Sequence, residues 1–203
     1  MLDLEIRREI IEVVKRLYRR GLNTTFSGNV SARASDERRF WITPTNRDKY
    51  RLRPEDLSLV DIETGERVFG EKQSSEYKLH LMIYRKRSDV KAVIHAHATH
   101  ANILARWLRI DASRALFNRF FEDFYEAKSY IDKYDIVDRF DPGSWELAEA
   151  VSEAFSRDPG VTIVLMLDHG LVSIGSSLVE ALNRVEVFED LSKIFLYELL
   201  LMK

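Results

Sequence analysis

The sequence contains no cysteine, and this absence limits the chemistry that the chain can perform. Without cysteine there are no disulfide bonds, no thiolate metal ligands and no cysteine nucleophile. Any bound metal ion must therefore be held by histidine, aspartate or glutamate side chains. The absence of disulfides fits a reducing compartment, so we expect a cytoplasmic protein.

Long hydrophobic runs are also missing. No stretch approaches the roughly 18 uninterrupted apolar residues of a membrane span. The charges nearly balance, with 31 Lys and Arg against 33 Asp and Glu, which gives a formal net charge of −2. This balance gives no reason to expect a nucleic acid or a membrane as a partner. An anionic ligand must instead be met by a local group of donors.

The composition and the hydrophobic pattern indicate an α+β fold. The 203 residues, 45% hydrophobic and 32% charged, suit a single domain over residues 1–203. Helical spacing is found at 4–18, 79–83, 98–108, 145–155 and from about 178 to the C-terminus, and strand-like runs at 29–33, 40–43, 57–62, 67–69, 91–95, 161–167 and 171–174. Because strands and helices do not alternate strictly, we expect a central, mainly antiparallel β-sheet flanked by helices. Residues 110–142 are rich in aromatic side chains and give no clear pattern.

Two of the five histidines form a pair that suggests a metal site. Alternate residues of a strand project to the same face, so His95 and His97 are expected side by side at a strand end. His169 lies in a turn between two predicted strands and offers a third nitrogen. Three protein ligands with one open position are typical of catalytic zinc. An H-x-H pair alone is a weak signal, however, and we expect His80 and His100 either to be structural or to support the ligating residues.

Three segments carry the small hydroxyl and amide side chains that suit an anion. They are Thr25–Asn29, Thr43–Asn46 and the pair Ser74-Ser75, which can cap a predicted helix. Any turn or cap needs the same residue types, so no single segment establishes a phosphate site. Glu76 follows in the first turn of that helix, where a carboxylate is normally a capping residue, although it could also bind a metal or transfer a proton.

Taken together, these motifs resemble the class II aldolase/adducin family, most closely its L-fuculose-1-phosphate aldolases. The matching strings are Gly21-Leu22-Asn23 with Ser27-Gly28-Asn29-Val30-Ser31, Ile42-Thr43-Pro44-Thr45, Ser74-Ser75-Glu76 with His80, Ala92-Val93-Ile94-His95-Ala96-His97, and Asp168-His169-Gly170-Leu171. All five occur in the order of the family and with roughly its spacing, over residues 5–108 and 160–198.

The resemblance implies a zinc enzyme that acts on a sugar phosphate. In the family, the residues that match His95, His97 and His169 bind one zinc ion per subunit. The residue that matches Glu76 completes the coordination and then acts as general base and acid. The implied reaction is reversible cleavage of a ketose 1-phosphate, such as L-fuculose 1-phosphate, to dihydroxyacetone phosphate and an aldehyde such as L-lactaldehyde, through a zinc-stabilised enediolate. The positions that hold the phosphate are Gly28, Asn29, Thr45, Asn46, Ser74 and Ser75. A homotetramer is also implied.

Three alternatives stay open at this stage. Pentulose-phosphate 4-epimerases of the family share the zinc site but typically carry Asp at the position of Glu76. Methylthioribulose-phosphate dehydratases match less well at Ser74-Ser75-Glu76. Adducin-like members are non-catalytic binding modules without the metal ligands, which this chain retains.

Two departures from the family pattern concern the substrate. The family usually has Gly after Thr or Ser, whereas this chain has Asn46 followed by Arg47, which could add a positive charge to the phosphate site. Residues 110–141 do not align, although the aldolases place there a tyrosine that handles the aldehyde. Tyr125, Tyr130 and Tyr134 are candidates, but aromatic side chains this dense usually pack together. The sequence therefore does not predict the aldehyde.

Overall fold

The computed structural model of the protein describes residues 2–201 and is built around one eight-stranded sheet. The strand order is β4-β3-β2-β1-β5-β8-β7-β6. The bounds are β1 Asn29–Arg33, β2 Arg39–Ile42, β3 Ser58–Asp61, β4 Arg67–Phe69, β5 Ala92–Ala96, β6 Lys133–Val137, β7 Val161–Met166 and β8 Gly170–Gly175. Neighbouring strands are antiparallel except β6 and β7 at one edge, which confirms the mainly antiparallel sheet.

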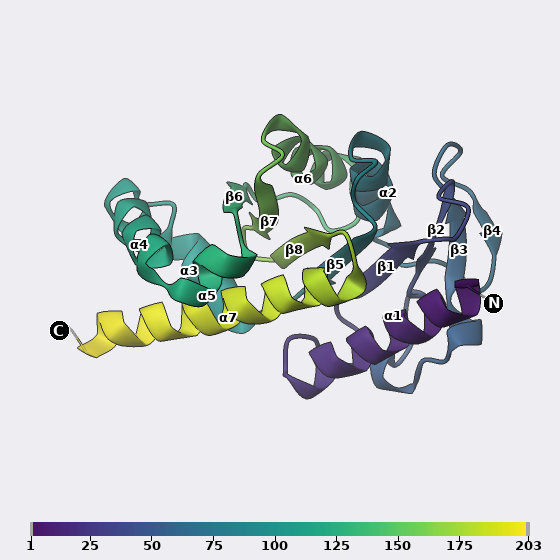
Figure 1. Ribbon diagram of the computed structural model, residues 1–203, viewed down its shortest axis with the longest axis horizontal. Helices are drawn as coiled ribbons and strands as arrows, with labels where there is room; N and C mark the ends of the chain where they lie inside the picture. Colours follow the sequence, from purple (N-terminus) through teal and green to yellow (C-terminus); the bar gives the residue numbers. More distant parts are fainter. Residues whose placement is uncertain (1, 202–203) are drawn as a thin grey trace.

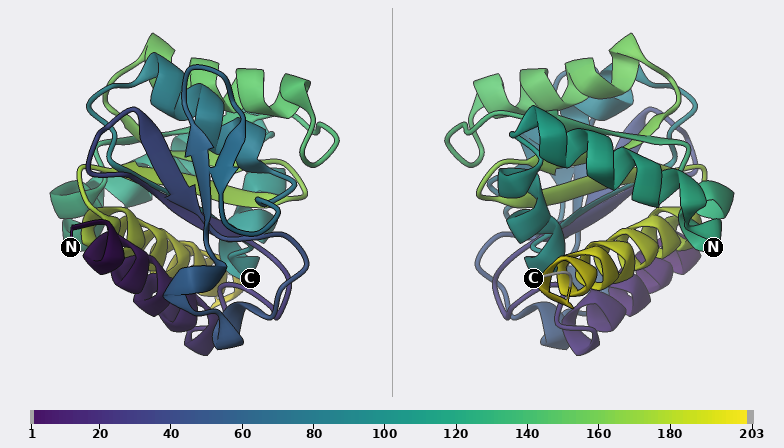
Figure 2. Two further views of the ribbon diagram at one scale, coloured as in Figure 1. Left: turned by 90° about the vertical axis from the view of Figure 1, so that its right-hand side faces the viewer. Right: turned by 90° about the vertical axis from the view of Figure 1, so that its left-hand side faces the viewer.

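Helices cover both faces of this sheet. The bounds are α1 Leu2–Arg19, α2 Tyr77–Lys86, α3 Thr99–Trp107, α4 Asp111–Asp123, α5 Tyr125–Tyr130, α6 Trp145–Arg157 and α7 Leu178–Leu201. Helices α2 and α6 lie together on one face, whereas α1 and α7 cover the other (Figures 1 and 2). Helix α5 lies beside the first half of α7, where Arg184 Nε donates to the carbonyl of Tyr130, and α4 lies toward the C-terminal half of α7 (Figure 1). Among the helices of residues 2–201, none has the length and apolar character that a membrane span requires.

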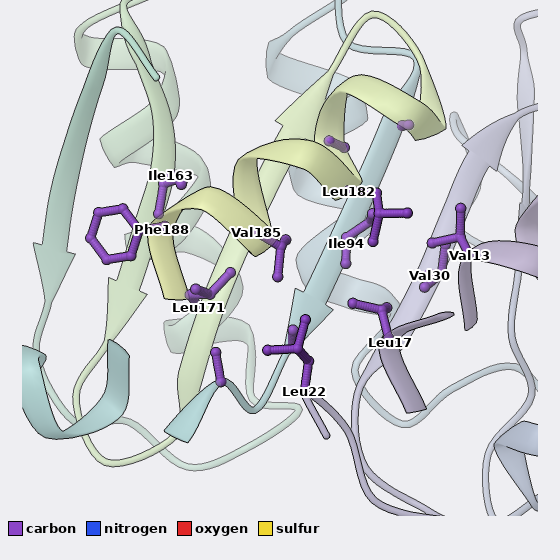
Figure 3. Packing of buried hydrophobic residues seen from close by; sticks show 14 of the residues in the cluster. Val13, Leu17, Leu22, Val30, Ile94, Ile163, Leu171, Leu182, Val185 and Phe188 are labelled. Atoms are coloured by element: carbon purple, nitrogen blue, oxygen red, sulfur yellow. The ribbon is translucent and has the colours of Figure 1, made fainter. Parts of the chain in front are cut away.

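Strand β5 shows how the two faces receive different side chains. All five of its residues are buried, and successive side chains point to opposite faces. Ile94 joins the hydrophobic cluster under α1 and α7, where Figure 3 shows it beside Leu182 of α7. Val93 joins the cluster under α2 and α6. Each fully buried aliphatic side chain contributes about 1.5–3 kcal/mol to stability. By the same alternation, His95 faces the side of α2.

The structure corrects the predicted start of the second helix. Helix α2 begins at Tyr77 with Glu76 as its N-cap residue, and the Ser74 and Ser75 side chains do not cap it. Instead, Ser74 Oγ accepts the backbone N–H of Glu76 at 3.3 Å. The reason is that residues 72–74 pair with the turn after β2, where the N–H of Ser74 donates to the carbonyl of Thr43 at 3.1 Å. This pairing holds the serines outside the helix.

Candidate active site

The turn between β7 and β8 brings His169 to the end of β5. Strand β8 pairs with β5 so that Ala96 lies opposite Leu171. Asp168 turns the chain with a left-handed backbone at φ +61°. Gly170 allows the close approach, because a Cβ atom there would lie 2.3 Å from the carbonyl oxygen of Ala96. His169, which follows Asp168, is therefore held directly against the pair formed by His95 and His97.

Glu76 joins these three histidines from the start of α2. The Nε2 atoms of His95 and His97 lie 3.0 Å apart. Glu76 Oε2 lies 3.3 Å from His95 Nε2, and Glu76 Oε1 lies 3.1 Å from His169 Nε2. One nitrogen or oxygen from each residue falls within 4.8 Å of all the others. A tetrahedral zinc ion with ligands at about 2.0–2.1 Å would separate neighbouring ligand atoms by roughly 3.3–3.4 Å. The four residues, here called the metal centre, thus have the spacing of a metal-binding group.

The hydrogen-bonding pattern of the metal centre also fits a bound cation. His95 Nδ1 donates to the carbonyl of Leu171 at 3.0 Å, which directs Nε2 and its lone pair toward Glu76 and His97. Among the described residues, Glu76 Oε1 is buried and accepts no hydrogen bond. Imidazole nitrogens and a carboxylate suit a divalent ion such as zinc. The residues present therefore fit the ion that the sequence predicts.

The charges of the metal centre favour an ionised glutamate and a neutral His97. Burial would raise the pKa of Glu76, but the neighbouring His95 and His169 outweigh it and hold this pKa well below its usual range. Burial lowers the pKa of His97 to about 3. Glu76 is therefore a negative acceptor near pH 7, and His97 can offer an unprotonated nitrogen to a metal.

A buried chain of hydrogen bonds holds Glu76 in place. Asn29 Nδ2 donates to Glu76 Oε2 at 2.9 Å, while His80 Nε2 bonds to Asn29 Oδ1. Ser31 Oγ lies 2.6 Å from His80 Nδ1 and 2.8 Å from the Tyr84 hydroxyl. Because the Asn29 amide donates to the carboxylate, its oxygen must accept from His80, so His80 Nδ1 must accept from Ser31. We call these five residues the relay, and all their bonds run in one direction.

The relay gives His80 the structural place that the sequence predicts. Its imidazole is fully buried, and burial lowers the pKa of His80 to about 3, so the ring carries a single proton near pH 7. His100 lies elsewhere, at the start of α3, and its Nδ1 atom is 2.8 Å from Oε1 of Glu189 on α7. Glu189 also accepts the backbone N–H groups of His100 and Ala101. His100 therefore orders a helix start and lies outside the metal centre.

One cavity of about 280 Å³ lies directly beside the metal centre. Its lining includes all six residues predicted to hold a phosphate: Gly28, Asn29, Thr45, Asn46, Ser74 and Ser75. The rest of its lining consists of Phe26, Ser27, Lys49, Glu76, His97, Pro142 and His169. We call it the anion cavity. The strand register helps to assemble it, because Asn29 of β1 lies directly opposite His95 of β5. The sequence motifs thus converge on a single concave site.

The two departures at positions 46 and 47 have different outcomes. Asn46 has a left-handed backbone with φ +51°, a conformation that Gly adopts without strain and that Asn tolerates better than most residues. Position 46 therefore has a backbone conformation that a glycine would also adopt. The charge expected from Arg47 does not reach the cavity, because Arg47 pairs with Glu71 and lies 3.5 Å from Asp56. The lysine that lines the cavity is Lys49, a residue outside the five sequence motifs.

A second cavity, of about 310 Å³, is also bordered by His97. Its lining consists of His97, Thr99, Asn102, Ile103, Arg106 and Asp168. Nothing in the sequence pattern singled out this wall, since α3 carries ordinary helical residues. The side chain of Asn102 is notable, because its buried Oδ1 has no hydrogen-bond partner among the described residues. The metal centre is thus open on two sides of different character.

The three candidate tyrosines lie away from both cavities. Tyr134 is on β6, where its hydroxyl donates to Asn118 and its ring packs against Phe117. Tyr125 and Tyr130 are exposed on α5. Within the described part of a single chain, none of the three lines the anion cavity or the second cavity. Any role for them at the aldehyde end would require a neighbouring subunit.

Comparison with known proteins covers almost the whole chain. Residues 8–196 match the family described as Class II Aldolase and Adducin N-terminal domain. The chain is 34% identical over 197 residues to an L-fuculose phosphate aldolase of Methanocaldococcus jannaschii, covering 97% of this chain and 99% of that protein. It is 31% identical to a 3-oxo-tetronate 4-phosphate decarboxylase of Haemophilus influenzae, with 96% and 89% coverage. A methylthioribulose-1-phosphate dehydratase of Methylococcus capsulatus is 36% identical, with 90% and 89% coverage.

Comparison of the fold with solved structures finds members of the same family. A solved structure of an L-fuculose 1-phosphate aldolase matches with a TM-score of 0.83 at 28% identity, covering 98% of this chain and 88% of that one. The names of these relatives describe lyases that act on phosphorylated compounds. The protein is therefore an enzyme that belongs to the class II aldolase and adducin family, as the five motifs predicted.

Proposed function

We propose that the enzyme is a zinc-dependent aldolase that reversibly cleaves a ketose 1-phosphate of the L-fuculose 1-phosphate type. The products would be dihydroxyacetone phosphate and an aldehyde such as L-lactaldehyde. The observation that carries this proposal is the position of Glu76, which contacts the histidine group and also lines the anion cavity. The 34% identity with an L-fuculose phosphate aldolase supports the choice of substrate.

Glu76 would move the proton in this reaction. A divalent ion held by His95, His97 and His169 would supply a Lewis acid that stabilises negative charge on the substrate. In the condensation direction, Glu76 takes a proton from the carbon beside the ketone, that carbon bonds to the aldehyde carbon, and the aldehyde oxygen takes up a proton to become a hydroxyl. In the cleavage direction, that hydroxyl loses its proton as the carbon–carbon bond breaks, and Glu76 returns a proton to the carbon beside the ketone. The relay keeps the carboxylate aimed, because Asn29 donates to one of its oxygens.

The anion cavity would hold the phosphate that both directions share. Small hydroxyl and amide side chains can donate hydrogen bonds to a phosphate, and three segments of the chain bring such side chains to the lining of this cavity. Anchoring the phosphate fixes the distance between the ketone end of the substrate and Glu76. One zinc ion per subunit and a homotetramer complete the proposal, and both rest on the family resemblance. The cytoplasmic location stays a prediction.

A substrate screen tests the aldolase proposal against the other activities in the family. Dihydroxyacetone phosphate is offered with several aldehydes, and L-fuculose 1-phosphate is offered for cleavage. Ribulose and xylulose phosphates, methylthioribulose 1-phosphate and 3-oxo-tetronate 4-phosphate test epimerase, dehydratase and decarboxylase activity. We expect carbon–carbon bond formation with dihydroxyacetone phosphate. Turnover of one of the other compounds, with none in the aldol assay, would replace the proposed reaction.

Metal analysis of the purified protein tests the family's alternative of a binding module. We expect about one divalent ion per chain, the stoichiometry of a single three-histidine site. A metal-free protein that stays inactive after zinc is added, with all histidines intact, would overturn the catalytic proposal.

A further inference from the structure

The anion cavity contains one buried ammonium group, that of Lys49. This residue begins a short 3₁₀ turn, Lys49–Arg51, which Asp48 caps by accepting the N–H of Tyr50. Although lysine is usually exposed, Lys49 is only 3% accessible to solvent. It lines the same cavity as Thr45 and Ser74. A charged group is therefore held beside the hydroxyl groups that would bind a phosphate.

The Lys49 ammonium is short of partners. It has three N–H donors, and one of them donates to the carbonyl of Pro44 at 2.9 Å. No carboxylate of the described residues forms an ion pair with Lys49. Burial lowers the pKa of Lys49 to about 8, and the nearby charge of Glu76 offsets this only in part. Burying a charge without a counter-ion costs stability, so such a group is favoured where a ligand supplies the counter-charge.

The neighbouring cations differ from Lys49 in this respect. Arg47 is neutralised by Glu71 outside the cavity, and Arg51 is exposed beside Asp48. Lys72, which also precedes a cavity-lining segment, is exposed to solvent. Of the basic residues in the described chain, Lys49 is the one that lines the anion cavity. Among the Lys and Arg side chains of the described residues, only that of Lys49 can therefore bring a positive charge to this cavity.

We propose that the Lys49 ammonium binds the phosphate of the substrate and supplies the charge that the surrounding hydroxyl and amide groups lack. Its two remaining N–H groups donate to phosphate oxygens, while the bond to Pro44 holds the ammonium at the turn that carries Thr45 and Asn46. The inference rests on the proposed function for the identity of the anion. It goes beyond that function because it assigns the recognition of charge to a residue outside the six predicted positions.

Binding of glycerol 3-phosphate, measured by isothermal titration calorimetry, tests this assignment. This probe has a phosphate monoester but no ketone and no bond that the enzyme can cleave, so the readout does not depend on turnover. We expect Lys49→Met to raise the Kd by about 10- to 100-fold, the range of a lost charge-assisted hydrogen bond. Lys49→Arg, which keeps the charge, should retain more affinity than Lys49→Met.

Lys72→Met is the matched control, since it removes the same charge from an exposed position nearby. It should change the Kd by less than about twofold. Lys49→Met should fold, because it replaces a buried charge by an apolar chain of similar length. Lys49→Gln provides a second uncharged variant. If both uncharged variants bind the probe as tightly as the wild type, the assignment is wrong.

The outcome is separate from that of the aldolase proposal. A protein that binds the probe through Lys49 but forms no carbon–carbon bond keeps this inference and loses the proposed reaction. A protein with aldolase turnover whose Kd is unaffected by Lys49→Met keeps the reaction and loses the inference.

Discussion

The metal centre and the aromatic segment at residues 110–141 use buried space in opposite ways. The metal centre buries the side chains of Glu76, before α2, and His95, on β5, so that each polar atom needs a specific partner. The aromatic segment fills its space with rings, and Phe117 lies 5.1 Å from Phe195 and 5.5 Å from Tyr134 between ring centroids. Such ring pairs contribute about 0.5–1.5 kcal/mol each beyond their buried area. The metal centre therefore buries polar groups at a cost in stability, whereas the aromatic segment stabilises the fold.

The largest expected effect at the metal centre is on turnover. Glu76→Gln keeps the size of the side chain but removes the base, so we expect kcat in the aldol assay to fall by about 10²–10⁴-fold. The histidines are untouched, and bound zinc, measured by elemental analysis, should stay near the wild-type level. A zinc-loaded Glu76→Gln variant with full activity would show that Glu76 does not transfer the proton.

Removal of a histidine should act on the metal itself. His95→Ala, His97→Ala and His169→Ala each delete one nitrogen of the group that converges within 4.8 Å. We expect zinc affinity to fall more than about 100-fold, beyond the 10- to 100-fold loss typical of residues that only support a ligand. Competition with a chelator measures the affinity. His100→Gln lies outside the metal centre and should bind zinc normally, so equal losses in both sets would contradict the assignment.

Disruption of the relay should have a smaller effect than loss of Glu76 or of a histidine, and it should lower kcat without changing KM. Ser31→Ala removes the donor to His80 Nδ1, so His80 can change tautomer and the Asn29 amide can rotate its oxygen toward Glu76. We expect about a tenfold fall in kcat with an unchanged KM for the phosphate substrate. Ser152→Ala is the control, since Ser152 is equally buried but bonds to the carbonyl of Glu149. Identical kinetics in the two variants would remove the relay from the mechanism.

Lys49 tests the idea that buried charge near the metal centre costs stability. Its pKa is about 8 in the folded chain, whereas an unperturbed lysine has a pKa of 10.5, so between these values the unfolded chain binds the proton and the folded chain does not. Stability therefore rises with pH across this window and is lost again as the pH falls from 10.5 through 8. We expect the free energy of unfolding, relative to Lys49→Met, to change by on the order of 2–3 kcal/mol between about pH 7.5 and about pH 10.5.

Urea denaturation in buffers without phosphate measures this difference, because a bound anion would restore the counter-charge. Lys72→Met is compared in the same buffers. A constant difference between wild type and Lys49→Met across the pH range would mean that Lys49 has an ordinary pKa.

The smallest expected effect lies in the aromatic segment. Tyr134→Phe removes the hydroxyl that donates to Asn118 but keeps the ring in its cluster. We expect a loss of about 1 kcal/mol of stability and a kcat within about twofold of the wild type. Thermal denaturation and the aldol assay measure the two quantities. A tenfold fall in kcat would contradict this purely structural role, and it would indicate that Tyr134 acts at the site of a neighbouring subunit.

The sequence predicted the sheet from local spacing, and it predicted the four residues of the metal centre from the family resemblance, because the H-x-H spacing alone is a weak signal. Strands such as β5 appear as short apolar runs, and the interval from His95 to His97 determines that both point to one side. What could not be predicted depends on distant contacts. The serines at 74 and 75 are drawn out of α2 by Thr43, a residue far away in the chain. Lys49 and Arg47 look alike in sequence, and only the position of Glu71 separates their roles.

The aromatic segment was missed for a different reason. The spacing of Phe117, Phe120, Phe121 and Phe124 is helical, and this signal alone could have indicated α4. The short α5 and the edge strand β6 carry no comparable pattern. Strand β6 pairs in parallel with β7, so its place depends on a connection that the sequence does not reveal.

The register between β1 and β5 has a consequence for how this site can vary. Asn29 lies opposite His95, so one strand pair aligns the first donor to Glu76 with the first histidine. A residue inserted within either strand would turn one of the two side chains to the opposite face. An insertion in the exposed bend at residues 35–38 would leave that alignment intact. Insertions are thus tolerated in the bend that joins β1 to β2 and excluded within β1 and β5. A loop or a label is therefore best inserted in this bend.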